Sequence, residues 1–199
     1  MSHLGVLESE LREFLIELTS PQKLTLAAYC DELARWNKKI NLTGLTGVDM
    51  VRRLVVEPAW IGLQLRPAGV LADIGSGNGA PAIPLHVVCQ FQKCHLVEAR
   101  TKRAAFLRHL ATTLRMPEVK VHRGRLDEVK SNLGKPDWIS LQAVALTNEL
   151  VDSIRSIIAP TTTIVWITSP GVQVALKPVR ILSVPLTRTQ VFLFQLDLS

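Results

Sequence analysis

The sequence predicts an α/β fold, in which a mostly parallel sheet is wound on both faces by helices behind an N-terminal helical cap. Three observations support this prediction. Short apolar runs alternate with helical patterns from residue 69 onward, and residues 22–44 repeat apolar positions near a 3.6-residue period. The last two apolar runs are joined only by a short turn. A chain of 199 residues with 47% hydrophobic residues can bury such a core.

The first two helices of the cap are predicted from amphipathic patterns. Residues 4–18 form one such pattern, and residues 22–44 form the second. We expect Ser20 to be the N-cap of the second helix and Pro21 to be its first residue, where a missing amide hydrogen costs little.

A third cap helix is predicted over residues 48–65. Pro58 lies inside it, and a proline within a helix removes one backbone hydrogen bond, so we expect a break or kink there. The pattern changes soon afterwards. We therefore divide the chain into a helical cap, residues 1–66, and a core, residues 67–199.

The core is predicted from its alternating runs. Five apolar runs are expected to be parallel strands, at residues 69–74, 94–99, 119–124, 138–144 and 161–168. Helical patterns follow the first four, at residues 83–91, 102–114, 126–131 and 147–158. The connection between runs 180–186 and 189–198 is too short for a helical crossover. These two runs therefore predict an antiparallel hairpin at one edge of the sheet.

The first strand runs into the glycine-rich stretch "ADIGSGNGAPAIPL", residues 72–85. Ligands of doubly wound sheets bind beyond the carboxyl ends of the strands, and Gly75, Gly77 and Gly79 permit a close approach. No Gly-Lys-Ser/Thr follows, so the loop is not a P-loop. Ile74 stands where a serine-hydrolase elbow needs glycine. The pattern G-x-G-x-x-A leaves a dinucleotide site open.

Acidic residues flank this loop and favour S-adenosylmethionine over a pyrophosphate. Asp73 precedes the loop, where its charge repels a pyrophosphate but attracts the cationic methionine end of S-adenosylmethionine. Glu98 lies 23 positions after Gly75, and a carboxylate there can accept bonds from both ribose hydroxyls. Asp127 follows the third strand and can bond the adenine amino group. Each acid also has a purely structural alternative: Asp73 as an acid of the turn, Glu98 as an ordinary acid at a strand end, and Asp127 as a helix cap.

Composition narrows the partners. The chain carries a net charge of +6 and has a pI near 9.5. A basic cluster lies in its middle, where it indicates either a phosphate-binding face or a solvated helix face. The three cysteines and the histidines show no metal-ligand spacing, so we expect no metal. No run is long and apolar enough to span a membrane and no signal peptide is evident, so we expect a cytoplasmic protein.

Several motifs along nearly the whole chain resemble one family. They are "YCDELARWNKKINLTG" in the cap and, in the core, "LADIGSGNGAPAIPL", "LVEARTKRAAFLRHL" and "RGRLDEV". With these motifs the sequence resembles the bacterial ribosomal RNA small subunit methyltransferase G family, also called GidB. The glycine loop alone occurs in many methyltransferases, whereas the cap motif together with the Ile83-Pro84-Leu85 continuation is fairly specific.

The resemblance implies a Rossmann-like class I methyltransferase fold and S-adenosylmethionine as cofactor. It implies methylation of N7 of a guanosine in 16S rRNA, either free or in the small ribosomal subunit, by a protein that we expect to be a monomer. Carried over to this sequence, cofactor contacts fall on Gly75, Ala80, Leu126 and Asp127. Glu98 matches the ribose-side acid of the family.

The sequence also departs from the family pattern. Gln142 stands where the family has the arginine of a Ser-Arg-Ala motif, and Leu54 replaces a histidine that follows arginine. Ala80 replaces a larger residue, and Pro58 a serine after the acid Glu57. A further departure is the sequence Thr168-Ser169-Pro170-Gly171 in place of a Lys-Gly pair.

We interpret Gln142, at the end of the fourth strand, as the catalytic residue that meets the target base. Guanine N7 carries no proton, so no general base is needed. Cofactor contacts are expected from Asp73 and from the glycine loop, and four basic side chains are assigned to the RNA: Arg53, Arg100, Lys102 and Arg103. Two alternatives remain, a non-catalytic binding module that keeps the fold and an NAD(P)-dependent oxidoreductase.

Overall fold

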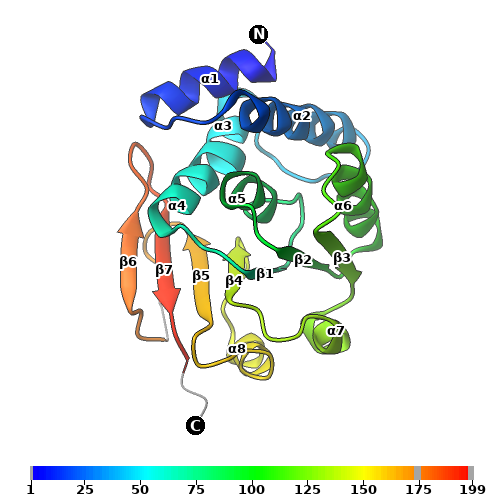
Figure 1. Cartoon of the computed structure of the whole chain (residues 1–199), viewed down its shortest axis with the longest axis vertical. Helices are drawn as coiled ribbons and strands as arrows, with labels where there is room; N and C mark the ends of the chain where they lie inside the picture. The colour runs from blue at the N-terminus through cyan, green and yellow to red at the C-terminus, as the bar shows by residue number, and fades with distance from the viewer. Residues whose placement is uncertain (1, 173–175, 197–199) are drawn as a thin grey trace.

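The core is a single seven-stranded sheet, shown in a computed structural model that describes residues 2–172 and 176–196 (Figure 1). The strands are β1 (Val70–Ile74), β2 (Lys93–Glu98), β3 (Val119–Arg123), β4 (Trp138–Gln142), β5 (Thr163–Thr168), β6 (Arg180–Ser183) and β7 (Gln190–Phe194). Their order in the sheet is β3-β2-β1-β4-β5-β7-β6. The first five strands are parallel, and β7 is antiparallel to both of its neighbours. The predicted mostly parallel sheet with a C-terminal hairpin at one edge is confirmed.

Helices cover both faces of this sheet. They are α5 (Ala82–Cys89), α6 (Thr101–Thr113), α7 (Leu126–Val129) with the 3-10 turn η2 (Lys130–Asn132), and α8 (Asn148–Arg155). Neighbouring residues of β1 point to opposite faces, as a strand requires. Leu71 packs in the cluster that contains α5 and α6, and Ala72 in the cluster that contains α7 and α8. The result is a three-layer core with its helices in the predicted places (Figure 1).

The cap begins with α1 (His3–Glu13) and α2 (Ser20–Asn37), which lie across one side of the sheet (Figure 1). The predicted N-cap of α2 was wrong by one residue. Thr19 is the N-cap, and its side chain and that of Gln22 form a capping box with the backbone. This register is favoured because it satisfies two free amide groups, which Ser20 one residue later would not do with Gln22.

The third cap helix changes its winding just before Pro58. It consists of α3 (Gly47–Val51), the π-helical turn η1 (Arg52–Val56) and α4 (Glu57–Leu65). In the π turn the Glu57 amide donates to the Arg52 carbonyl, five residues back. The predicted irregularity near the proline is therefore a π turn, which proline tolerates because the local hydrogen-bond pattern is already shifted.

The cap and the sheet share buried apolar side chains. One continuous cluster joins Leu26 and Leu33 of α2 to Phe106 and Leu107 of α6. Helix α4 ends at Leu65 and β1 begins at Val70, on either side of the predicted division of the chain. Among the described residues no helix is both long and apolar enough to cross a membrane.

Candidate active site

Two cavities lie at the carboxyl ends of the parallel strands and meet at Gly75. The first, the cap-side cavity, has a volume of about 350 Å³ and lies between the glycine loop, the end of β4 and the cap. The second, the α8-side cavity, has a volume of about 310 Å³ and lies between the ends of β1, β2 and β3 and helices α7 and α8. This is the edge of the sheet at which the sequence predicts a ligand.

The glycine loop separates the two cavities. Gly75 has φ = +76°, and a Cβ atom there would lie 2.8 Å from Cγ2 of Val144. Gly79 has φ = +95°, and its Cβ would lie 3.1 Å from Ile83 at the start of α5. The missing Cβ of Gly75 therefore lets the Val144 side chain pack closely against the loop, and that of Gly79 lets α5 pack closely behind it.

Asp73 lies beneath this loop and lines neither cavity. It is 1% exposed, and its Oδ1 accepts a hydrogen bond of 2.6 Å from the Ser140 hydroxyl on β4. Its Oδ2 has no partner among the described residues. Burial raises the pKa of Asp73 from 3.8 to about 7, against the opposing effect of the Ser140 hydrogen bond. The sequence placed this acid next to the loop, but it did not show that the carboxyl is buried.

The carboxylate of Glu98, at the end of β2, binds the glycine loop through a backbone amide. Its Oε2 accepts from the Gly77 amide at 2.9 Å, and its Oε1 accepts from the Arg100 amide at 2.7 Å. The side chain is buried, and it lines neither cavity. An ionised carboxylate has about four acceptor sites, so these two bonds leave acceptor capacity for a ligand.

Leu126 and Asp127 line the α8-side cavity. The Oδ2 atom of Asp127 accepts a hydrogen bond of 3.0 Å from Ser153 of α8. Arg125 is the N-cap of α7, so Asp127 lies inside the helix and is not its cap. Apolar side chains, including Leu150, form much of the remaining wall. This cavity combines apolar side chains with two carboxylates, those of Asp127 and Glu149.

A loop of the cap covers the other cavity, and the sequence predictions did not assign it to the site. Leu42 and Thr43 line the cavity, and Asn37 fixes their backbone. The side-chain Oδ1 of Asn37 accepts hydrogen bonds from the backbone amides of Leu42 at 2.7 Å and Thr43 at 3.0 Å. Its side-chain Nδ2 donates to the backbone carbonyl of Thr43 at 2.9 Å. Arg103 donates to the carbonyl of Asn41 in the same loop. In the sequence, the Trp36-Asn37 motif was the feature that could have indicated this loop.

The π turn places Arg53 at the cap-side cavity. Its Nε lies 3.3 Å from Oε1 of the fully buried Glu57, whose Oε2 accepts a 2.6 Å hydrogen bond from Thr189. Burial raises the pKa of Glu57. The predicted RNA contacts are thus divided: Arg53 and Arg103 line this cavity, whereas Arg100 and Lys102 are exposed on α6 and line neither cavity.

Gln142 also lines the cap-side cavity, at the end of β4. Its Oε1 is buried without a hydrogen-bond partner in the described part of the chain. Leu54 and Ala80, two other departures from the family pattern, line the same cavity. A buried polar atom without a partner is unusual, and its presence beside the cavity singles out Gln142 as a candidate contact for a ligand.

The chemistry of the cap-side cavity is limited by its lining. Among the described residues, its lining side chains include two arginines and several amides and hydroxyls, but no carboxylate, histidine, lysine, tyrosine or cysteine. Such a lining can bind anionic or polar groups, but it cannot remove a proton at neutral pH. Over residues 2–172 and 176–196, no three His, Cys, Asp or Glu side chains are grouped as a metal site would need.

The strand order and the ligand cavity define a class I methyltransferase fold. A solved RNA methyltransferase from Salinibacter ruber, in complex with S-adenosyl-L-homocysteine, has a similar structure with a TM-score of 0.57 and 18% identity. The similarity covers 69% of this chain and 88% of that chain. It shows the shared fold.

Sequence comparison identifies the family. Residues 22–174 match the family model of rRNA small subunit methyltransferase G, GidB, and the chain belongs to this family. The ribosomal RNA small subunit methyltransferase G of Halorhodospira halophila is 32% identical over 77% of this chain and 73% of its own length. That of Geotalea uraniireducens is 36% identical over 66% of this chain and 61% of its own length. The predicted family is confirmed, and membership argues against the oxidoreductase alternative.

Proposed function

We propose that this protein transfers a methyl group from S-adenosylmethionine to N7 of a guanosine in 16S rRNA. The observation that carries the proposal is the lining of the cap-side cavity, which holds polar and cationic groups but no general base. Guanine N7 has a lone pair and no proton, so its methylation needs positioning without proton removal. Methylation of an amino group or a hydroxyl would need a proton acceptor. Family membership supports rRNA as the substrate.

The α8-side cavity fits the adenosine part of the cofactor. Leu126 and Leu150 provide apolar contacts for a flat ring, and Asp127 can accept from an exocyclic amino group. Glu98, at the end of β2 beside the glycine loop, retains acceptor capacity for ribose hydroxyls. When bound, S-adenosylmethionine supplies an electrophilic methyl group on a sulfonium. Gly75 lines both cavities, so that end of the cofactor would lie against its backbone.

In the cap-side cavity the residues of this chain would orient the base. The Gln142 amide can donate to guanine O6, which lies beside N7 on the same edge of the base. Arg53 and Arg103 provide positive charge for the neighbouring phosphates. Glu57 holds Arg53 in place, because its carboxylate lies against the Arg53 Nε. Gln142 is thus the residue that would touch the reacting base.

Transfer of a radiolabelled methyl group tests this proposal. The substrate is small-subunit rRNA, bare or in subunits, from a strain that lacks its own enzyme, and the label is mapped to a base and an atom. We expect label on guanine N7. Label on an amino group or a ribose hydroxyl would refute the assignment of the atom, and no label on either substrate would refute the proposed activity.

A non-catalytic binding module is the second candidate, because the departures at Leu54, Ala80 and Gln142 all line the cap-side cavity. Calorimetry with S-adenosylmethionine and NAD(P) separates it from the first. Cofactor binding without methyl transfer would favour the binding module. Substantial binding of NAD(P) alone would contradict both.

We also propose that the protein acts in the bacterial cytoplasm, where its proposed rRNA substrate is found, and that its active form is a monomer.

A further inference from the structure

The positive charge of the chain is concentrated in one segment. Between Ala99 and Leu126 there are eight lysines and arginines and a single acid, Glu118, whereas the whole chain has a net charge of +6. The remainder of the chain is therefore close to neutral. The eight basic residues are Arg100, Lys102, Arg103, Arg108, Arg115, Lys120, Arg123 and Arg125. Over the described ranges none of these side chains pairs with a carboxylate.

Three of these residues line a groove between α6 and β3, remote from the two site cavities. The groove has a volume of about 700 Å³ and contains Arg108, Arg115 and Lys120 over an apolar floor that includes Met116 and Val119. Strand β3 is an edge strand, so no further strand covers this side of the sheet. We call this surface the α6–β3 groove.

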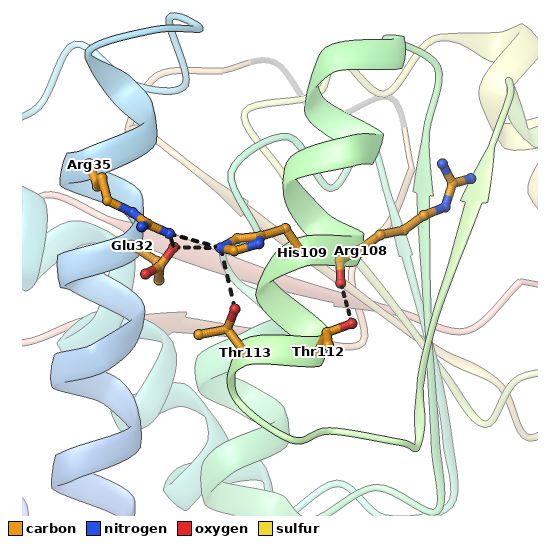
Figure 2. A network of polar contacts seen from close by, with 6 residues as sticks. All are labelled: Glu32, Arg35, Arg108, His109, Thr112 and Thr113. Carbon is orange, nitrogen blue, oxygen red and sulfur yellow. Dashed lines mark hydrogen bonds and ion pairs between the residues drawn. The ribbon is translucent and has the colours of Figure 1, made fainter.

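Helix α6 uses its two sides differently, as Figure 2 shows. His109 and Thr113 face α2, where His109 lies 2.7 Å from the carboxylate of Glu32, which also pairs with Arg35. The side chain of Arg108 extends from the opposite side of the helix (Figure 2). The Glu32 carboxylate is therefore used on the cap side, and Arg108 points the other way with no carboxylate partner in the described ranges.

The same helix connects the groove to the proposed reaction site. Arg103, in its first turn, lines the cap-side cavity, and Arg115 lies just beyond its end in the groove. At 1.5 Å per residue the two positions are separated by about 18 Å along the helix. A strand of nucleic acid with one base in the cavity can cover this distance with a few nucleotides.

We propose that the α6–β3 groove binds the phosphate backbone of the rRNA that flanks the target nucleotide. This inference rests on the proposed methylation of rRNA and adds a second contact that contributes affinity without touching the reacting base. A polyanion fits best, because three cations without a carboxylate partner in the described ranges line one groove, and Arg103 at the other end of α6 lines the cap-side cavity. Arginine and lysine contacts to phosphates position a protein on RNA without reading its sequence.

The test removes the three charges together, in the variant Arg108→Gln/Arg115→Gln/Lys120→Gln. A matched control, Arg12→Gln/Lys135→Gln/Arg188→Gln, removes three exposed charges elsewhere on the surface. Binding to 16S rRNA is measured over a range of KCl concentrations, and methyl transfer is measured at saturating cofactor. Melting temperatures establish that each variant is folded, and the single variant Arg115→Glu repeats the measurement with one change.

We expect the slope of log affinity against log salt to become less negative by about 2 in the groove variant, because each lost contact to single-stranded phosphate removes about 0.7 from its magnitude. Its KM for rRNA should rise at least tenfold, with kcat and cofactor affinity unchanged. The control should change none of these. A salt slope and KM equal to those of the control would overturn the inference. The basic residues of the groove would then bind an acidic protein or protect the edge of the sheet from pairing with another strand.

Failure of the inference and failure of the proposed function are distinguishable. If the wild-type protein methylates rRNA and the groove variant behaves like the control, only the groove assignment is wrong. If the wild-type protein neither binds nor methylates rRNA, the proposed function has failed, and the groove assignment fails with it. A fall in kcat or in cofactor affinity would also contradict the inference, since the groove would then act on the site itself.

Discussion

The two cavities that meet at Gly75 differ in how closely they follow the family. The α8-side cavity contains Leu126 and Asp127, which match the family pattern. The cap-side cavity contains three departures from it, Leu54, Ala80 and Gln142. The departures thus lie where we propose that the methyl acceptor binds, including Ala80, which was expected to contact the cofactor. The matching residues lie where we propose that the adenosine part of the cofactor binds. This difference predicts that cofactor affinity and rRNA turnover can be altered separately.

The largest effect of a substitution is expected at the junction of the two cavities, where cofactor affinity and rRNA turnover should no longer change independently. Gly75→Ala introduces a Cβ 2.8 Å from Val144 at φ = +76°. Left-handed backbone alone costs a non-glycine residue about 1–2 kcal/mol, and the clash adds to it. We expect a loss of S-adenosylmethionine affinity of about 100-fold or more, as 2.8 kcal/mol corresponds to that factor. Calorimetry measures this loss.

Gly134→Ala is the matched control for this variant. Gly134 also has a positive φ, +65°, but a Cβ there meets nothing within 4 Å. It should lower stability slightly and leave the cofactor affinity unchanged. Equal losses of affinity in both variants would show that backbone strain, and not the junction of the cavities, determines binding.

The next largest effect should appear on the cap side only. Gln142→Ala removes the amide proposed to hold the base, a contact of the kind worth roughly 1–3 kcal/mol. We expect kcat/KM for rRNA to fall about 30-fold, while the affinity for S-adenosylmethionine changes less than twofold. Gln92→Ala, at an exposed glutamine outside both cavities, is the control and should change neither quantity. A comparable loss of cofactor affinity would mean that the two cavities do not act separately.

The converse effect is expected on the α8 side. Asp127→Ala should raise the Kd for S-adenosylmethionine about tenfold, since a hydrogen bond to a charged group contributes about 1.5–3 kcal/mol. The KM for rRNA should stay unchanged. Asp152→Ala, at an exposed acid of the neighbouring helix that pairs with Arg155, tests whether a lost negative charge alone has this effect. If both variants weaken cofactor binding equally, Asp127 has no specific contact.

Much of this comparison could be predicted from the sequence, and the parts that could not share a physical reason. The strands, the hairpin and the position of Gln142 at a strand end follow from local apolar patterns. The covering of the cap-side cavity does not, because it depends on hydrogen bonds from Asn37 to residues five and six positions later. Pro58 indicated an irregular helix, but the sequence did not show that a π turn would aim Arg53 at the cavity.

The sequence also did not show which of the basic residues line a cavity and which do not. Arg100, Lys102 and Arg103 are near neighbours in the chain, yet only Arg103 lines a cavity. On a helix, successive residues point about 100° apart, so a cluster in sequence covers several faces. Which face meets the cap is decided by α2, which packs against α6 through contacts such as Trp36 with Phe106.

The smallest effect concerns Asp73, which is buried beneath the glycine loop and lines neither cavity. Its folded pKa of about 7 lies above the ordinary 3.8, because burial disfavours the charged form. Such an acid stabilises the fold fully below pH 3.8, and that contribution is lost as the pH rises through 7. Asp73→Asn stays neutral throughout, so its melting temperature should gain on the wild type between pH 4.5 and 8, by roughly 5 °C for a chain of this size. Asp152→Asn, at an exposed acid, should show no such trend, and a pH-independent difference for Asp73→Asn would contradict a neutral carboxyl at this position.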